Sequence, residues 1–234
     1  MLSLLIGVEN IGILKKSNVL VIGLGGVGAY AAENICRGGI GRMTIADGDI
    51  VNASNINRQL PAFHSSVGKA KATLMSRRLL DINPSLHLRV INEYLKDEDM
   101  DCILASEKFD YVVDAIDTLS PKLYLISKAL QNKLPLVSSM GAGGKLDPSR
   151  VIVCDISETY NCRLAYILRK RLRKIGVTSG FNVVFSPEQV DRGAVIPVHG
   201  EKNKKSTVGT VSYMPPLFGC YCASVVIRDL IFKN

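Results

Sequence analysis

A glycine-rich loop with the sequence VIGLGGVG follows a short β-branched run and precedes a helical pattern. Between a strand and a helix, glycines at this spacing permit a tight turn, close approach of backbone N–H groups to a phosphate, and close helix–strand packing. The helix N-terminus also favours a bound anion. We therefore expect a nucleotide's phosphates at the four glycines Gly23, Gly25, Gly26 and Gly28.

An aspartate ends the next β-branched run. Asp47 follows residues 43–46, at a position where a carboxylate can accept hydrogen bonds from ribose hydroxyls. Asp49, two residues later in the same turn, is predicted to line the same nucleotide site. An NAD-dependent dehydrogenase fits these features equally well, so the loop alone does not decide the chemistry.

Cationic and amide side chains farther along the chain favour a triphosphate whose α-phosphorus is attacked. Charge develops on the leaving pyrophosphate in that reaction, and Arg and Lys together with a metal ion stabilise it. A carboxylate at the end of a later strand is placed to hold Mg²⁺ between phosphate oxygens. The candidates are Asn55, Arg58, Gln59 and Lys71 near the phosphates, and Asp114 and Asp117 at the end of the fourth predicted strand.

The elements that must position these residues alternate along the chain. β-Branched runs occupy residues 19–22, 43–46, 88–91, 111–114 and 136–139, with helical patterns at 27–37, 69–82 and 121–132. Such alternation is typical of βαβ units. We predict an α/β fold, Rossmann-like and doubly wound, with a mainly parallel sheet, helices on both faces and a basic C-terminal elaboration.

The composition of the chain changes after residue 145. A loop, GAGGKLDPSR, leads to a predicted strand at 151–154, a basic helix at 163–174, a strand at 183–185 and a last helix at about 219–232. We expect one domain over residues 1–234, with a nucleotide-binding core at 1–145 and the basic elaboration at 146–234. Pro215, Pro216 and Gly219 interrupt the apolar run 211–227, which argues against a membrane span.

The net charge of +8 is concentrated in the last third of the chain. Residues 1–150 contain 17 basic and 15 acidic side chains, whereas residues 151–234 contain 12 and 6. A basic segment beside a near-neutral core favours a polyanionic partner such as nucleic acid, although a solvated helix face stays an alternative. The candidate nucleic-acid contacts are Arg163, Arg169, Lys170, Arg171, Arg173 and Lys174 on one predicted helix, with Lys202, Lys204 and Lys205 in a later loop.

The six cysteines form no CxxC pair. This usage argues against a disulfide framework or a zinc site and favours a reducing compartment. Because no signal-peptide pattern is visible at the start, we expect a cytoplasmic protein. Cys162 stands directly before the basic helix, whose cations can lower a thiol pKa, so its reactivity is left open.

Taken together, these motifs resemble the adenylation domain of the ubiquitin-activating-like (ThiF/MoeB/HesA) family over residues 4–145. The resemblance implies ATP with Mg²⁺, attack of a carboxylate on the α-phosphorus, and release of pyrophosphate. It implies that Asp47 holds the ribose and that Asp117 holds the metal. It assigns the phosphates to Asn55, Arg58, Gln59 and Lys71, and makes Arg58, Lys71 and Asp117 the expected catalytic residues.

The order of features in the C-terminal part is similar to the tRNA threonylcarbamoyladenosine dehydratase branch of that family, and this likeness extends from about residue 4 to the end. The likeness implies adenylation of the threonyl carboxylate of N6-threonylcarbamoyladenosine in tRNA, then ring closure by a urea-type nitrogen with net loss of water. It also implies tRNA as partner, a homodimer and no membrane association, and it names no sulfur-transfer partner. The alternative is an adenylyltransferase that activates the C-terminal Gly-Gly of a sulfur-carrier protein, although such enzymes commonly carry the two CxxC pairs missing here.

Overall fold

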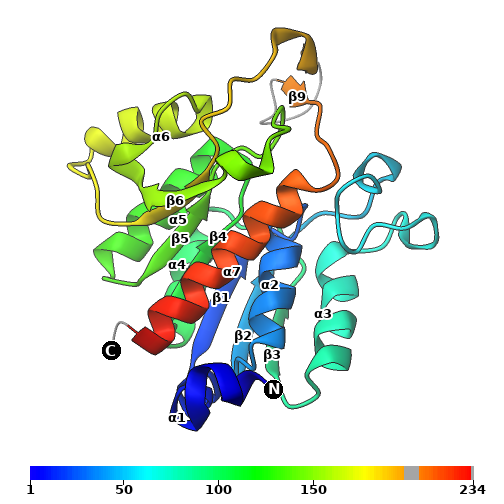
Figure 1. Ribbon diagram of the computed structural model, residues 1–234, viewed down its shortest axis with the longest axis vertical. Coiled ribbons are helices and arrows are strands. Elements are labelled where there is room, and N and C mark those ends of the chain that lie inside the picture. Colours follow the sequence, from blue (N-terminus) through cyan, green and yellow to red (C-terminus); the bar gives the residue numbers. More distant parts are fainter. Residues whose placement is uncertain (198–205, 233–234) are drawn as a thin grey trace.

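The computed structural model describes residues 1–197 and 206–232. A seven-stranded sheet in the order β3-β2-β1-β4-β5-β7-β6 forms its centre (Figure 1). All pairings are parallel except that of β6 with β7. The strands are β1 (Asn18–Ile22), β2 (Arg42–Ala46), β3 (His87–Ile91), β4 (Tyr111–Asp114), β5 (Leu136–Ser139), β6 (Ile152–Asp155) and β7 (Asn182–Phe185). The predicted α/β, Rossmann-like fold with a mainly parallel sheet is confirmed.

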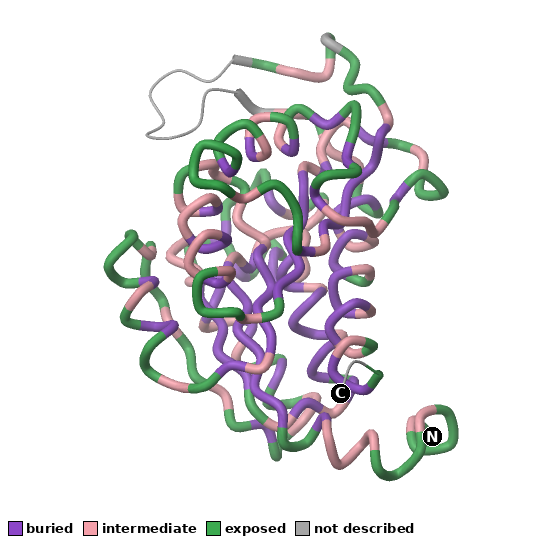
Figure 2. Tube along the Cα trace, turned by 90° about the vertical axis from the view of Figure 1, so that its left-hand side faces the viewer, coloured by how far each residue is buried: buried purple, intermediate pink, exposed green. Residues whose placement is uncertain are grey.

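Helices cover both faces of the sheet, as predicted. One face packs against α1 (Leu2–Lys16), α2 (Gly28–Arg37), α3 (Lys71–Ile82) and α7 (Met214–Phe232). The other packs against α4 (Asp97–Ser106), α5 (Leu119–Gln131) and α6 (Arg163–Arg173). Side chains of β1 alternate between the two cores, Val19 and Val21 on one face and Leu20 and Ile22 on the other. This central strand is buried along its whole length, as Figure 2 shows for the sheet.

The last helix is longer than predicted. Pro215 and Pro216 lie in the first turn of α7, where proline is tolerated because those backbone N–H groups have no helical acceptor. The expectation that they interrupt the apolar run was therefore wrong, and α7 is 19 residues long. By length and composition it is apolar enough to cross a membrane, but half of the relevant window is buried inside the fold.

Close packing of α7 on α2 explains that burial. A Cβ atom at Gly219 would lie 2.4 Å from the carbonyl oxygen of Val27, and one at Gly38 would lie 2.8 Å from Ile227. The two glycines allow the helices to run side by side (Figure 1). The first turn of α7 therefore lies beside the glycine loop, which precedes α2.

Helix α4 falls outside the predicted elements, and so do two further features. Residues 2–16 form α1, which contains a kink at Gly7, and a short β8–β9 hairpin pairs Val195–Pro197 with Ser206–Val208. Figure 2 shows the first turns of α1 projecting away from the body of the fold. The segment after residue 145 supplies β6, β7, α6 and α7 to the same sheet and its covering layers.

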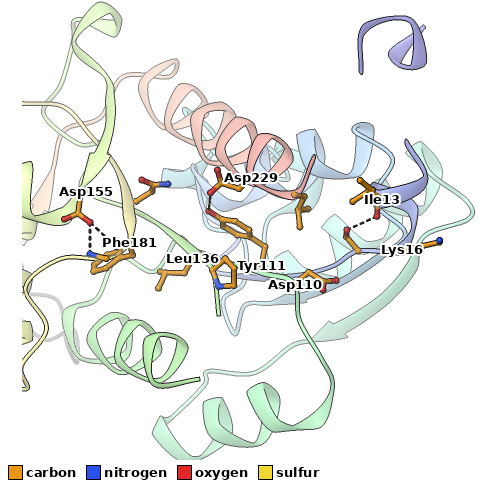
Figure 3. A pocket seen from close by; sticks show the side chains of 13 residues that line it. Ile13, Lys16, Asp110, Tyr111, Leu136, Asp155, Phe181 and Asp229 are labelled. Atoms are coloured by element: carbon orange, nitrogen blue, oxygen red, sulfur yellow. Dashed lines mark hydrogen bonds between the residues drawn. The ribbon is translucent and has the colours of Figure 1, made fainter. Parts of the chain in front are cut away.

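A cavity of about 660 Å³ opens at the N-terminal ends of the parallel strands. Figure 3 shows Tyr111, whose hydroxyl donates to Asp229 of α7 at 2.8 Å, among the residues that line it. It lies at the opposite end of the strands from the glycine loop. Its lining includes none of the residues predicted to bind the nucleotide. Those residues follow the C-terminal ends of the parallel strands.

Candidate functional site

The glycine loop joins three elements at the C-terminal ends of the strands. Gly23 ends β1 with φ of +89°, and a Cβ atom there would lie 2.7 Å from the carbonyl oxygen of Ala115. A Cβ atom at Gly28 would lie 1.8 Å from the carbonyl oxygen of Gly23. Any side chain at either position would force apart β1, α2 and the turn that follows β4. These two glycines are therefore required for packing.

Of the other two glycines, Gly25 has room for a side-chain carbon above the loop and Gly26 has none. A Cβ atom at Gly25 would meet only the side-chain nitrogen of Gln59, at 3.7 Å, whereas one at Gly26 would lie 2.9 Å from Pro215. No described side chain caps the N-terminus of α2. A helix start has backbone N–H groups without helical acceptors and a positive dipole end, which is the anion-binding element that the sequence predicts.

Hydrogen bonds of the Asp47 side chain connect the end of β2 to the glycine loop. Its Oδ2 accepts a hydrogen bond from the backbone N–H of Leu24 at 2.6 Å, and its Oδ1 accepts one from that of Asp49 at 2.7 Å. Burial raises the pKa of the Asp47 carboxyl, while the charge of Lys71 and the two hydrogen bonds oppose that rise. The predicted contact with ribose stays a prediction, and the structure places this carboxylate beside the loop that would carry it.

Lys71 reaches the site from the first turn of α3. Its Nζ lies 2.8 Å from Oδ2 of Asp49, and its side chain is 5% exposed, whereas that of Asp49 is 44% exposed. The hydroxyl of Tyr94 donates to Oδ1 of the same carboxylate, which raises the pKa of Tyr94 to about 12. Sequence reasoning missed Tyr94. Its position directly after the third parallel strand was the available signal, because strand ends line the crevice.

The segment between β2 and α3 supplies the predicted amide and guanidinium groups. Asn55 is buried, and its side-chain oxygen accepts from the backbone N–H of Asn52 at 3.1 Å. The carbonyl oxygen of Asn55 accepts from the N–H groups of Arg58 and Gln59. Asn55 therefore shapes the turn that presents its two neighbours, and its predicted phosphate contact stays a prediction.

The side chains of Arg58 and Gln59 lie beside the glycine loop, since the Arg58 Cγ would be 3.5 Å from a Cβ atom at Gly26 and the Gln59 amide nitrogen 3.7 Å from one at Gly25. The Arg58 guanidinium donates to the carbonyl oxygen of Ser54 at 2.9 Å, and burial lowers its pKa although the charge of Asp117 opposes this. The side-chain oxygen of Gln59 is buried and has no hydrogen-bond partner. A buried unpaired oxygen is costly, which indicates that a group absent here completes it.

The two carboxylates after β4 have different surroundings. Asp114 is fully buried, and its Oδ2 lies 2.7 Å from Nζ of Lys122 and accepts from the hydroxyl of Ser138 at 2.6 Å. Its Oδ1 accepts from the backbone N–H of Ile116 at 3.1 Å. Asp117, three residues later, is exposed and near the charge of Arg58. The prediction that Asp114 contacts the nucleotide is therefore corrected, because its side chain is 0% exposed, and Asp117 is the exposed carboxylate near Arg58.

The residues present fit a nucleotide triphosphate with a magnesium ion. The described residues include no group of three or more His, Cys, Asp or Glu side chains that could hold a metal alone. Mg²⁺ typically binds through one or two carboxylates together with substrate phosphates and water. A single carboxylate is therefore sufficient, and Asp117 provides one. The unpaired Gln59 oxygen, the uncapped helix and the cations Arg58 and Lys71 supply the remaining donors and acceptors.

The basic helix α6 packs on α5 through Ala165, Leu168 and Leu172. The exposed predicted contacts are Arg163, Lys170, Arg171, Arg173 and Lys174. Arg169 differs, because its guanidinium donates to the carbonyl oxygen of Thr159 at 2.6 Å and to the Thr159 hydroxyl. Arg169 is partly buried and holds this turn, and its predicted contact with nucleic acid stays a prediction. Lys202, Lys204 and Lys205 lie outside the described residues.

All six cysteines are free, as predicted. Cys162 is 7% exposed and lies near the charge of Lys145. Burial lowers the pKa of the Lys145 ammonium, whose Nζ donates to the backbone carbonyl of Glu188. A thiol so little exposed is poorly placed to react with a macromolecular substrate.

The chain is similar to known proteins over nearly its whole length. The model of the ThiF family matches residues 1–233. The tRNA threonylcarbamoyladenosine dehydratase of Bacillus subtilis is 37% identical, over 97% of this chain and 92% of its own length. The structure of the Escherichia coli tRNA N6-threonylcarbamoyladenosine dehydratase in complex with ATP is similar with a TM-score of 0.89 and 33% identity, covering 99% of this chain and 93% of that chain. An Escherichia coli molybdopterin-synthase adenylyltransferase is 34% identical over 53% of this chain and 49% of its own length.

Proposed function

This chain belongs to the ThiF family, and from that premise we propose that it is an ATP-dependent tRNA threonylcarbamoyladenosine dehydratase. The observation that carries the proposal is the extent of the likeness. Similarity to the dehydratases continues through the basic C-terminal part, whereas similarity to the adenylyltransferase covers about half of the chain. Activation of a sulfur-carrier protein is therefore the less supported alternative.

In the proposed reaction, ATP lies along the glycine loop. The N–H groups at the start of α2 and the side-chain amide nitrogen of Gln59 donate to its phosphates, and Asp47 accepts from its ribose. Lys71 exchanges part of its contact with Asp49 for a phosphate oxygen, which is feasible because Asp49 is 44% exposed and can be solvated. Mg²⁺, held by Asp117, supplies further neutralisation of the phosphate charge when it is bound.

Two bond exchanges complete the chemistry. A carboxylate oxygen of the threonyl arm attacks the α-phosphorus, and pyrophosphate leaves, with Arg58 and Lys71 offsetting the developing negative charge. The urea-type nitrogen of the same arm then attacks the activated carbonyl carbon, loses its proton, and displaces AMP. The product has lost the elements of one water molecule, which are accounted for by cleavage of ATP to AMP and pyrophosphate.

The exposed cations of α6 are proposed to contact the tRNA backbone. Arg163 begins the helix and Lys174 follows its end, so the charge extends along its whole length. Phosphate contacts from these side chains supply affinity without base specificity. We also infer a cytoplasmic location, where tRNA is the abundant polyanion of this kind.

A second copy of the chain is proposed to cover the start of α1. Met1, Leu4, Leu5 and Val8 are between 78% and 98% exposed. Contiguous apolar surface of this kind typically marks an interaction site. Light scattering should show a dimer for the native protein and a monomer for the double variant Leu4→Ser/Leu5→Ser. A monomeric native protein would contradict the proposed homodimer.

The function is tested by incubating the protein with ATP, Mg²⁺ and tRNA that carries threonylcarbamoyladenosine. Mass spectrometry of the nucleoside digest should show a product lighter by one water than the modified nucleoside. The matched control is the same mixture without ATP. No lighter product under conditions in which ATP binds would overturn the proposal. Pyrophosphate exchange that depends on a carrier protein ending in Gly-Gly, and not on tRNA, would establish the alternative.

A further inference from the structure

A buried ion pair lies beneath the turn that carries Asp117. Lys122, in the first turns of α5, is 0% exposed, and its Nζ lies 2.7 Å from Oδ2 of Asp114, which is also 0% exposed. The same Nζ donates to the carbonyl oxygen of Ile116 at 3.0 Å. Ser138 of β5 donates its hydroxyl to Asp114. Side chains from β4, β5 and α5 therefore converge below the peptide that precedes Asp117.

Fold stability is a poor explanation for such a pair. Removing two charges from water costs several kcal/mol per ion, and apolar residues of similar volume often replace a buried pair without loss of stability. What the pair supplies here is geometry. Lys122 holds the carbonyl of Ile116 while Asp114 holds the N–H of the same residue at 3.1 Å. The backbone directly before Asp117 is thus fixed on both sides.

The same turn also contacts the glycine loop. The carbonyl oxygen of Ala115 would be 2.7 Å from a Cβ atom at Gly23, and the Ala115 methyl would be 2.9 Å from one at Gly28. The backbone N–H of Ala115 donates to the carbonyl of Ile22 at 2.9 Å. A shift of the turn would therefore change where Asp117 stands relative to the phosphate-binding loop.

We propose that Lys122 is a positioning residue, which acts through Asp114 and the Ile116 carbonyl to hold Asp117 at the place where it meets the magnesium–ATP complex. The inference rests on the proposed function, because that function brings ATP to the site. Lys122 itself does not touch the nucleotide. Replacing Lys122 should therefore lower the affinity for ATP in the presence of Mg²⁺ and leave the affinity without Mg²⁺ nearly unchanged.

The first test compares Lys122→Met with Lys128→Met. Lys128 lies on the same helix and pairs with Asp101 at 3.0 Å, but that pair is partly exposed and distant from the turn. Calorimetric titration with ATP is done in Mg²⁺ and again in EDTA. For Lys122→Met, we expect affinity in Mg²⁺ to fall about tenfold and affinity in EDTA to change little, as is typical when a group supporting a metal ligand is lost. Lys128→Met should match the native protein in both titrations.

Since a single substitution leaves Asp114 buried without its partner, a second variant removes both charges. Lys122→Met/Asp114→Asn should melt near the native temperature, as judged by circular dichroism, and should still lose the magnesium-dependent affinity. Native affinity in that variant would overturn the proposal. Equal losses in Mg²⁺ and in EDTA would also overturn it, because the pair would then act on the fold as a whole.

A double-mutant cycle with Asp117→Asn separates positioning from general damage. If Lys122 acts through Asp117, adding Lys122→Met to Asp117→Asn should cause no further loss of magnesium-dependent affinity, whereas additive losses would contradict the proposal. These titrations need no tRNA. Failure of the dehydration assay with an intact magnesium-dependent effect would overturn the proposed function and leave the positioning role standing.

Discussion

Two lysine–aspartate pairs flank the central strand β1 at the end where the nucleotide is proposed to bind. After β2, Lys71 pairs with Asp49 at 2.8 Å, and after β4, Lys122 pairs with Asp114 at 2.7 Å. The distances are nearly equal, but the exposure differs. Asp49 is 44% exposed, whereas Asp114 and Lys122 are sealed from solvent.

This difference in exposure assigns the pairs different tasks. A carboxylate open to water can be solvated when its lysine turns to a new anion, so the pair after β2 can change partners. A sealed pair cannot do so without leaving a buried charge, which is strongly destabilising. The pair after β2 is therefore suited to binding and the pair after β4 to holding a turn in place.

The largest effect is expected from removing the exchangeable cation. Lys71→Ala should lower the rate of product formation by about 10² to 10³-fold, because a charge that stabilises the leaving pyrophosphate is lost. Arg58→Ala should behave similarly. Thermal melts should show that both variants remain folded. The matched control is Lys69→Ala, because Lys69 is an exposed lysine in the same segment. Native turnover in Lys71→Ala would contradict the binding role assigned to the pair after β2.

Basic side chains on α6 also differ in their surroundings, because some are exposed and Arg169 is hydrogen-bonded to Thr159. Replacing the exposed Lys170, Arg173 and Lys174 together by Ala should weaken tRNA binding about tenfold near 0.15 M salt, and should flatten its salt dependence. Filter binding at several salt concentrations measures both quantities. Arg169→Ala should instead lower the melting temperature, because its guanidinium bonds to Thr159. An affinity loss from Arg169→Ala as large as that of the triple variant would contradict this division and would show that Arg169 also meets tRNA.

A smaller effect is expected at Tyr94. Tyr94→Phe removes the hydroxyl that donates to Asp49, so the carboxylate competes more strongly with phosphate for Lys71. The KM for ATP should rise about fivefold with kcat nearly unchanged, which corresponds to loss of one ordinary hydrogen bond. Steady-state kinetics of pyrophosphate release test this expectation. An unchanged KM would mean that Tyr94 does not tune the pair after β2.

The smallest effect concerns an ion pair away from the site. Burial raises the pKa of the Glu33 carboxyl, but hydrogen bonds and charges of Arg78 and Arg37 outweigh this, so its pKa lies below the ordinary 4.5. A lowered folded pKa contributes stability above the unfolded value, and that stability is lost as pH falls through the folded value. Glu33→Gln should melt lower than the native protein near pH 7, with the gap narrowing below about pH 4. A gap independent of pH would contradict this, and ATP affinity should not change.

Sequence reasoning predicted the parts of the fold that depend on local patterns. The β-branched runs, the glycine loop and Lys71 at the start of a helix are all legible within a few residues. The burial of Asp114 is not, because it depends on Lys122 and Ser138, which reach it from other elements. Asp114 and Asp117 therefore look equivalent in the sequence although their surroundings differ.

The other differences between sequence and structure depend on context that a local pattern does not contain. Arg169 and Lys170 are neighbours in a basic run, and only the position of Thr159 distinguishes them. Tyr94 belongs to no motif, and its role depends on Asp49 in a distant loop. Pro215 and Pro216 signal a helix break, yet they fit the first turn of α7.

The central claim is that a substrate carboxylate is adenylated at the site between the two pairs. Single-turnover reaction with tRNA whose threonyl carboxylate carries ¹⁸O in both oxygens tests it most directly. The account predicts one ¹⁸O in the phosphate of each AMP released and one retained in the ring carbonyl of the dehydrated nucleoside. AMP free of the label, or label found instead in inorganic phosphate, would contradict attack of the carboxylate on the α-phosphorus.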